Sequence, residues 1–311
     1  MKIAFVFPGQ GSQSVGMLDA WADHAGVQQT LREGNAALGE DLTTLIAQGP
    51  LDTLNLTANT QPVMLLAAVA MYRAWVEAGG TLPDIVAGHS LGEYSALTAV
   101  GAMDLADALR TVRIRAQAMQ AAVPVGTGGM AAILGLDDAT VQRLCTEAAQ
   151  GEIVEAVNFN APAQVVIAGH LAAVERACEQ ARAAGAKRAL LLPVSAPFHS
   201  RLLQPAAQVL QHALHQVTLC KPTIPLINNV DVARPIDPAS IKDALVRQAW
   251  HPVRWVETIQ AMKADGVTHI IECGPGKVLS GLTKRIDRDI QALSITDPGS
   301  LQQALDLLGG D

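Results

Sequence analysis

Short, fully apolar segments recur along this chain, and they restrict the folds open to it more than any other feature. Four of them, each ending in or beside Gly, Pro or Asn, occupy residues 3–7, 85–87, 224–228 and 269–272. Stretches of helical composition, such as residues 62–78, separate them. Strands that are apolar on both faces are typical of a parallel sheet with helices on both sides. The sequence therefore predicts an α/β protein with a mostly parallel sheet.

Residues 126–195 follow a different pattern, in which strands and helices alternate at short intervals. We expect strands at residues 130–136, 153–158, 164–168 and 188–192, with helices at 139–149, where Asp137 is the expected cap, and 172–184. The order βαββαβ is typical of a compact ferredoxin-like α+β unit. Because Pro and Gly are frequent at both edges, we interpret this unit as an insertion. The predicted domains are therefore residues 1–124 with 197–311, and residues 125–196.

Composition excludes several classes of protein. Half of the 311 residues are apolar and the formal charge is −7, so neither disorder nor a general nucleic-acid surface is expected. The four cysteines, Cys145, Cys178, Cys220 and Cys273, lack the spacing of a zinc site and are expected to be buried free thiols. The apolar run at residues 3–7 is too short for the core of a signal peptide, and the longest helix-like apolar run, at residues 63–72, is far short of a bilayer span. We therefore expect a cytoplasmic protein with no metal site and no membrane contact.

One pentapeptide of the form G-x-S-x-G lies between an apolar strand and a helix. In that context Gly88 and Gly92 allow a sharp turn that exposes the hydroxyl of Ser90. The N–H of Leu91 is then an unpaired amide at a helix start and can point at an oxyanion. This pattern predicts Ser90 as a covalent nucleophile. A turn whose glycines serve packing alone is the alternative.

A serine nucleophile needs a base, and the chain offers eight histidines. His199 is favoured because it lies in residues 193–200, a constrained loop at the exit of the inserted unit. His89 adjoins the serine on a tight turn, so its side chain should point away and serve a structural role. His212 and His215 fall on a predicted surface helix and should be solvated.

A glycine-rich turn at residues 7–13 ends the first strand. It does not fit G-x-G-x-x-G, because position 14 is Ser14, and the run around Lys277 lacks the Ser or Thr of a P-loop. Nucleotide phosphate binding is thus not supported. We expect instead that the backbone N–H at or near Gln10 is a second oxyanion donor beside Leu91.

Residues 104–123 show a helical stripe of apolar side chains with an arginine on each side. Arg113 or Arg115 could lie at the rim of the core with its charge in water. Alternatively, one guanidinium could bind a substrate carboxylate through two parallel hydrogen bonds. Periodicity does not choose between the two arginines.

Several segments together resemble one family. They are residues 5–13 (FVFPGQGSQ), 88–97 (GHSLGEYSAL), 158–170 (NFNAPAQVVIAGH), 198–199 (FH) and 274–279 (GPGKVL). In this order and over nearly the whole chain, they resemble bacterial malonyl-CoA:acyl carrier protein transacylases, which act in fatty acid biosynthesis. The resemblance implies a hydrolase-like large α/β domain with a ferredoxin-like small one.

The resemblance also implies roles for particular residues. Ser90 would be acylated, His199 would be the base, and the N–H groups of Gln10 and Leu91 would hold the oxyanion. A backbone carbonyl near Gln248 would orient the histidine in place of an aspartate. Arg115, rather than Arg113, would pair with the malonyl carboxylate. Met119 and Phe198 are further candidates for contact with the substrate, and the bulk of Phe198 would disfavour branched acyl groups.

The function that follows is a ping-pong transfer of malonyl from malonyl-CoA to the thiol of acyl carrier protein, by a monomer without cofactors. Carrier proteins are generally acidic, so we expect a basic surface patch where the carrier docks. The candidates are Lys187 with Arg188, and Lys277 with Lys284 and Arg285. A serine esterase or thioesterase with the same dyad, and a non-catalytic scaffold that binds the carrier, remain alternatives.

Overall fold

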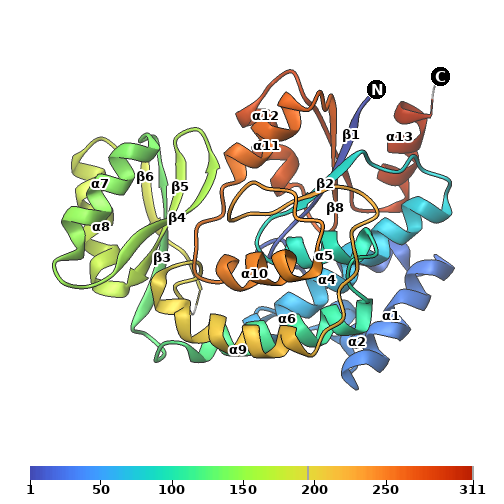
Figure 1. Ribbon diagram of the computed structural model, residues 1–311, viewed down its shortest axis with the longest axis horizontal. Coiled ribbons are helices and arrows are strands. Elements are labelled where there is room, and N and C mark those ends of the chain that lie inside the picture. Colours follow the sequence, from blue (N-terminus) through green and yellow to red (C-terminus); the bar gives the residue numbers. More distant parts are fainter. Residues whose placement is uncertain (195, 310–311) are drawn as a thin grey trace.

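Two β-sheets organise the computed structural model, which describes residues 1–194 and 196–309 (Figure 1). The larger sheet has the strand order β7-β2-β1-β8-β9, and all its pairs are parallel. Its strands are β1 (Ile3–Phe7), β2 (Ile85–Gly88), β7 (Leu226–Ile227), β8 (His269–Cys273) and β9 (Gln291–Ile295). The prediction of a mostly parallel sheet is confirmed.

Helices cover both faces of this sheet, and strand β1 shows how. Its side chains alternate between two cores, because successive residues of a strand point to opposite faces. Phe5 and Phe7 pack against α4 (Thr57–Glu77), where both rings contact Tyr72. Ala4 and Val6 join the opposite core with α11 (Trp255–Ala264) and α12 (Val278–Ile286). All five residues of β1 are therefore buried.

The remaining helices of the larger unit surround this framework (Figure 1). They are α1 (Ala25–Leu38), α2 (Leu42–Gln48), α3 (Leu51–Leu54), α5 (Gly92–Ala99), α6 (Leu105–Ala121), α9 (Gln204–His215), α10 (Pro238–Gln248) and α13 (Pro298–Leu308), with short 3-10 turns at Asp19–Trp21 and Arg201–Leu203. Helix α6 begins where the sequence predicts, because the side chain of Asp104 accepts hydrogen bonds from the N–H groups of Ala106 and Asp107. Both His212 and His215 are exposed on α9, as expected.

The second sheet forms a separate body at one side of Figure 1. Its elements are β3 (Gly128–Leu134), α7 (Asp138–Ala149), β4 (Val154–Ala161), β5 (Gln164–His170), α8 (Leu171–Ala183) and β6 (Arg188–Leu191). The strand order is β4-β5-β3-β6 and every pair is antiparallel. Asp137 caps α7 by accepting from the Thr140 N–H. The predicted βαββαβ unit is confirmed, whereas the domain limits at 124/125 and 196/197 stay a prediction.

Three details differ from the sequence analysis. Strand β7 has two residues instead of five, since Pro225 precedes it and the backbone of Asn228 already turns back to bond Ala233. Strand β9 was not predicted, because an edge strand with exposed Gln291 lacks the apolar signature of its neighbours. Cys220 is exposed in the connection between α9 and β7, so the expectation of a buried thiol is wrong there and right for the other three cysteines.

No helix in residues 1–194 and 196–309 is long and apolar enough to cross a membrane. Ser195, which belongs to the predicted loop at 193–200, lies outside the described residues, as do Gly310 and Asp311.

Candidate active site

Ser90 lies on the sharp turn between β2 and α5, at the carboxyl end of the parallel sheet. Its φ of +52° is in the left-handed region, which a residue with a Cβ rarely occupies. The flanking glycines are required sterically. A Cβ on Gly88 would lie 1.9 Å from the backbone of Gly92, and a Cβ on Gly92 would lie 2.0 Å from the carbonyl oxygen of Phe7. The turn therefore forms only because both positions lack a side chain.

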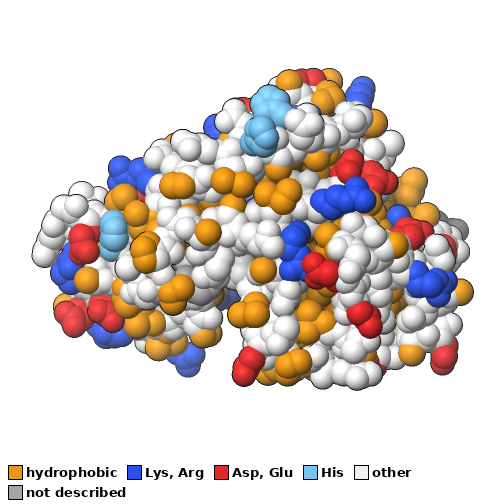
Figure 2. Space-filling view, turned by 90° about the horizontal axis from the view of Figure 1, so that it is seen from below, with side chains coloured by type: hydrophobic (Ala, Val, Ile, Leu, Met, Phe, Trp, Pro, Cys, Tyr) orange, Lys and Arg blue, Asp and Glu red, His pale blue; other side chains and the backbone are white. Residues whose placement is uncertain are grey.

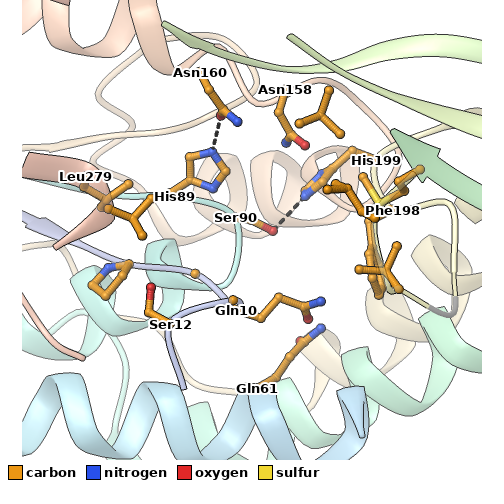
Figure 3. A pocket seen from close by; sticks show the side chains of 18 of the residues that line it. Gln10, Ser12, Gln61, His89, Ser90, Asn158, Asn160, Phe198, His199 and Leu279 are labelled. Carbon is orange, nitrogen blue, oxygen red and sulfur yellow. Dashed lines mark hydrogen bonds between the residues drawn. The ribbon is translucent and has the colours of Figure 1, made fainter. Parts of the chain in front are cut away.

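His199 faces this serine from 109 residues further along the chain, as Figure 3 shows. Its Nε2 lies 2.7 Å from Ser90 Oγ, and its Nδ1 lies 2.8 Å from the backbone carbonyl oxygen of Gln248. A carbonyl can only accept, so Nδ1 carries the proton and the Nε2 lone pair points at the serine hydroxyl. This tautomer is the one that a general base needs. The predicted place of Gln248 behind the histidine agrees with the geometry.

Burial and charge both keep His199 neutral. The side chain is 4% exposed, and burial, followed by the positive charge of Arg115, lowers the pKa of His199 from its ordinary value of 6.5 to about 3. The hydrogen bond to Gln248 opposes this shift. At neutral pH the imidazole is therefore unprotonated and able to take a proton.

Arg115 is the cation of the site. It is 2% exposed, and its Nη2 donates to Ser90 Oγ at 3.1 Å and to Gln248 Oε1 at 2.9 Å. Its Nη1 donates to Gln61 Oε1 at 2.8 Å. No carboxylate of the described chain hydrogen-bonds to this guanidinium. A buried guanidinium whose neighbours are neutral oxygens is suited to an incoming anion.

Arg113 is occupied elsewhere, although it lies on the same helix. Its guanidinium forms an ion pair with Glu40 and donates to the Ala58 carbonyl oxygen and to Asn59 Oδ1. The three-dimensional structure therefore separates two arginines that the periodicity of α6 leaves equivalent.

A cavity of about 280 Å³ opens beside Ser90, between the two sheets (Figure 3). Its wall is mainly apolar and includes Phe198 and Met130, with polar groups from Gln10, Gln61 and Asn160. Arg115 and His199 reach the same space. The cavity is thus an apolar pocket with a cation and a base beside one exposed serine, as expected of a binding site for an acidic acyl group.

Met119 does not belong to the wall of that cavity. It is 1% exposed, and its sulfur receives the Nε2–H of Gln61 at 3.9 Å, so it lies one layer behind the pocket. Contact between Met119 and the substrate therefore stays a prediction, and any such contact would need the neighbouring Gln61 to move.

Two backbone amides near the serine have no acceptor within the described residues: those of Gln10 and Leu91. Leu91 directly precedes α5, where the first N–H groups lack intrahelical partners. Gln10 lies in the turn after β1 and lines the cavity. Free amides at these two positions are what the predicted oxyanion hole requires.

Other polar residues surround the site, and sequence reasoning assigned a role to only one of them, His89. His89 points away from the serine, as expected, and its Nε2 meets Asn160 Oδ1 at 2.8 Å while its ring packs on Trp255. Gln61, Glu93 and Asn229 also contact residues of the site. Gln61 and Asn229 lie in no pattern whose spacing points to the serine, whereas Glu93 lies within the segment 88–97, three residues after Ser90, and that position could have marked it.

Basic side chains are exposed next to the cavity. Val278, Leu279 and Leu282 of α12 line it, and Lys277, Lys284 and Arg285 of the same segment are exposed. On the face of the molecule seen in Figure 2, by contrast, acidic and basic side chains are intermixed.

This fold and this site define a class. A serine on a nucleophile turn, a neutral histidine and a buried arginine beside an acyl-sized pocket are the parts of an enzyme that moves an acidic acyl group. Consistent with this, residues 4–294 match the model of the acyl transferase domain.

Comparison with known proteins narrows the class. The chain is 54% identical to the malonyl CoA-acyl carrier protein transacylase of Salmonella typhimurium over 98% of its own length and 99% of that protein. A crystal structure of an acyl-carrier-protein S-malonyltransferase from Burkholderia pseudomallei is 66% identical, covers 98% of this chain and 100% of its own, and superposes with a TM-score of 0.97. A complex of a type II PKS acyl-carrier protein with its malonyl-transacylase is 50% identical, at 99% and 100% coverage and a TM-score of 0.97. The chain belongs to the malonyl CoA-acyl carrier protein transacylase family.

Proposed function

We propose that this enzyme transfers the malonyl group from malonyl-CoA to the phosphopantetheine thiol of acyl carrier protein, in fatty acid biosynthesis. The observation that carries the proposal is the convergence of Ser90, His199 and Arg115 within hydrogen-bond distance at one cavity. The names of the relatives supply the acyl group and the carrier. The geometry of these three residues supports the following mechanism.

In the first half-reaction the serine becomes acylated. His199 Nε2 takes the proton of Ser90, and Oγ attacks the thioester carbonyl carbon of malonyl-CoA. The N–H groups of Gln10 and Leu91 hold the oxyanion. As the C–S bond breaks, the imidazolium returns the proton to the sulfur of coenzyme A, and a malonyl-serine ester remains.

In the second half-reaction the carrier takes up the acyl group. Its phosphopantetheine thiol gives a proton to His199, and the sulfur attacks the ester carbonyl. The C–O bond to Ser90 breaks, and the proton passes from the imidazolium to the serine oxygen. Because one acyl group leaves on CoA before the second thiol reacts, the kinetics are ping-pong. No metal or redox cofactor takes part in these steps.

Arg115 has two roles in this proposal. Its guanidinium pairs with the malonyl carboxylate. This charged partner takes the place of the neutral amide oxygens that the guanidinium otherwise contacts. The same pairing offsets the positive charge that lowers the pKa of His199. A bound malonyl group thereby makes the base stronger, which favours acidic over neutral acyl groups. Phe198 narrows the cavity on the side of the histidine and disfavours branched chains.

Docking of an acidic carrier fits the exposed cations Lys277, Lys284 and Arg285 beside the cavity, with Lys187 and Arg188 as a second candidate. We propose that these groups steer the carrier by charge. The monomeric state and the cytoplasmic location stay predictions from the sequence.

Mass spectrometry of the intact protein after mixing with malonyl-CoA tests the function. We expect a malonyl adduct on Ser90 that disappears when the carrier is added, and no adduct on S90A. Rapid release of free malonate without the carrier would identify a hydrolase. An unchanged mass of the wild type, with no malonate released, would support the alternative of a non-catalytic scaffold that binds the carrier.

A further inference from the structure

The strained serine turn is held by side chains from distant parts of the chain. The N–H of Ser90 donates to Asn229 Oδ1 at 2.7 Å, and Asn229 Nδ2 donates to the carbonyl oxygen of Gly88 at 2.6 Å. The carbonyl oxygen of Ser90 accepts from Gln248 Nε2 at 2.9 Å. Backbone in the left-handed region persists only where its surroundings hold it, and these three bonds are such surroundings.

Both of these residues are tied to one carboxylate. The N–H of Asn229 and the Nε2 of Gln248 each donate to Glu93 Oε2 at 3.0 Å. Glu93 lies in the first turn of α5, three residues after the serine, and is 2% exposed. Asn229 follows β7, whose neighbour in the parallel sheet is β2, so the carboxyl ends of the two strands place Asn229 beside the turn. A buried carboxylate that accepts from two sides of a turn restricts both sides at once.

Gln248 extends this arrangement to the rest of the site. Its backbone carbonyl accepts from His199 Nδ1, and its Oε1 accepts from Arg115. Glu93 is therefore hydrogen-bonded directly to Gln248, and Gln248 in turn contacts the nucleophile, the base and the cation. We propose that Glu93 and Asn229 are positioning residues of the acyl transfer, which clamp the serine turn and, through Gln248, the base. This inference rests on the proposed function, because it assumes that Ser90 is acylated.

The clamp depends on hydrogen-bond geometry rather than on charge. Burial raises the pKa of Glu93 to about 7, although the bonds from Gln248 and Asn229 and the charge of Arg115 act in the opposite direction, and Asp231 adds to the rise. The carboxyl group is therefore part-protonated near neutral pH. The N–H of Asn229 and the Nε2 of Gln248 both need one accepting oxygen. The amide oxygen of a glutamine at position 93 is neutral and can accept at the same place.

Single-turnover acylation of Ser90, followed by mass spectrometry, tests this with malonyl-CoA and with the neutral donor acetyl-CoA. We expect E93A and N229A, corrected for the folded fraction, to acylate about a hundredfold more slowly with both donors, because small misplacements of reacting groups cost about that much. E93Q keeps the acceptor and should stay within about threefold of the wild type. E33Q is the control for the exchange of a carboxylate for an amide, since Glu33 pairs with Arg73 at the surface and contacts no residue of the site, and it should also stay within about threefold.

Three results would overturn the inference. Wild-type rates in E93A and N229A would show that no clamp is needed. An E93Q variant as slow as E93A would show that charge, rather than geometry, matters. If the variants lost acylation rate with malonyl-CoA but not with acetyl-CoA, Glu93 would act through the charge of Arg115 rather than by holding the serine turn. If E93A does not fold, N229A and E93Q still decide the question. A wild-type protein that takes up no acyl group on Ser90 would refute the proposed function instead.

Discussion

Replacement of Arg115 by alanine should change which acyl groups the enzyme accepts. In the proposed complex its guanidinium forms a buried pair with the malonyl carboxylate, and removal of one partner of such a pair costs about 3–5 kcal/mol. That range corresponds to a fall in kcat/KM for malonyl-CoA of roughly 150-fold to 5,000-fold. Because Arg115 borders the cavity, water can reach the freed amide oxygens of Gln61 and Gln248. We therefore expect the lower half of the range.

Acetyl-CoA provides the contrast, because its acyl group has no carboxylate. For R115A we expect its kcat/KM to change by only about threefold, so that the preference for malonyl falls by roughly two orders of magnitude. The matched control is R113A, two residues earlier on α6, whose guanidinium pairs with Glu40 instead. It should leave both donors within about threefold. The assay is initial-rate transfer to the carrier with each donor, beside thermal unfolding of each variant. Equal losses for both donors in R115A would refute the assignment, since Arg115 would then act on the serine alone.

Three further predictions concern pH and charge. Because the pKa of His199 is lowered to about 3, kcat/KM for malonyl-CoA should not fall with a midpoint near 6.5 as pH drops; a stopped-flow pH profile with that midpoint would contradict the burial argument. The pKa of Glu93 is raised from 4.5 to about 7, so its folded form binds more protons than its unfolded form, and this group should remove about 3 kcal/mol of stability as pH rises from 4.5 through 7. The free energy of unfolding of E93Q in urea should therefore rise relative to that of the wild type as pH increases. If the two free energies changed with pH in parallel, the raised pKa of Glu93 would be disproved. Finally, K284E with R285E should slow transfer to the carrier about tenfold at low salt and leave transfer to free pantetheine unchanged; equal losses with both thiols would exclude steering.

Much of the fold follows from local patterns. The order of strands and helices between Gly128 and Leu191 was predictable because short apolar strand segments alternate there with amphipathic helical segments, one of which begins at the cap Asp137. The nucleophile turn was predictable for a similar reason, since Gly88 and Gly92 satisfy a steric need within five residues. Edge strand β9 was not, because pairing with β8, rather than its own side chains, makes it a strand.

The site was only partly predictable. A motif and a resemblance indicated Ser90, His199 and Arg115, and the structure brings them together. Met119, which the resemblance suggested as a substrate contact, is buried outside the cavity lining, because a resemblance does not tell which side chain another one covers. Glu93 and Asn229 were missed, since a buried polar residue has no periodic signature when its partner lies far away in the chain.

By itself, the sequence determined the properties that depend on near neighbours: a turn that only glycines allow, strands apolar on both faces, and the order of the elements. Only the tertiary structure decided which distant groups meet. The serine hydroxyl is met by a histidine 109 residues away, and its carbonyl by a glutamine 158 residues away. Arg115 faces the serine while Arg113 faces Glu40. The physical reason is that backbone conformation is set within a few residues, whereas burial, charge pairing and hydrogen bonding between remote segments exist only once the chain is packed.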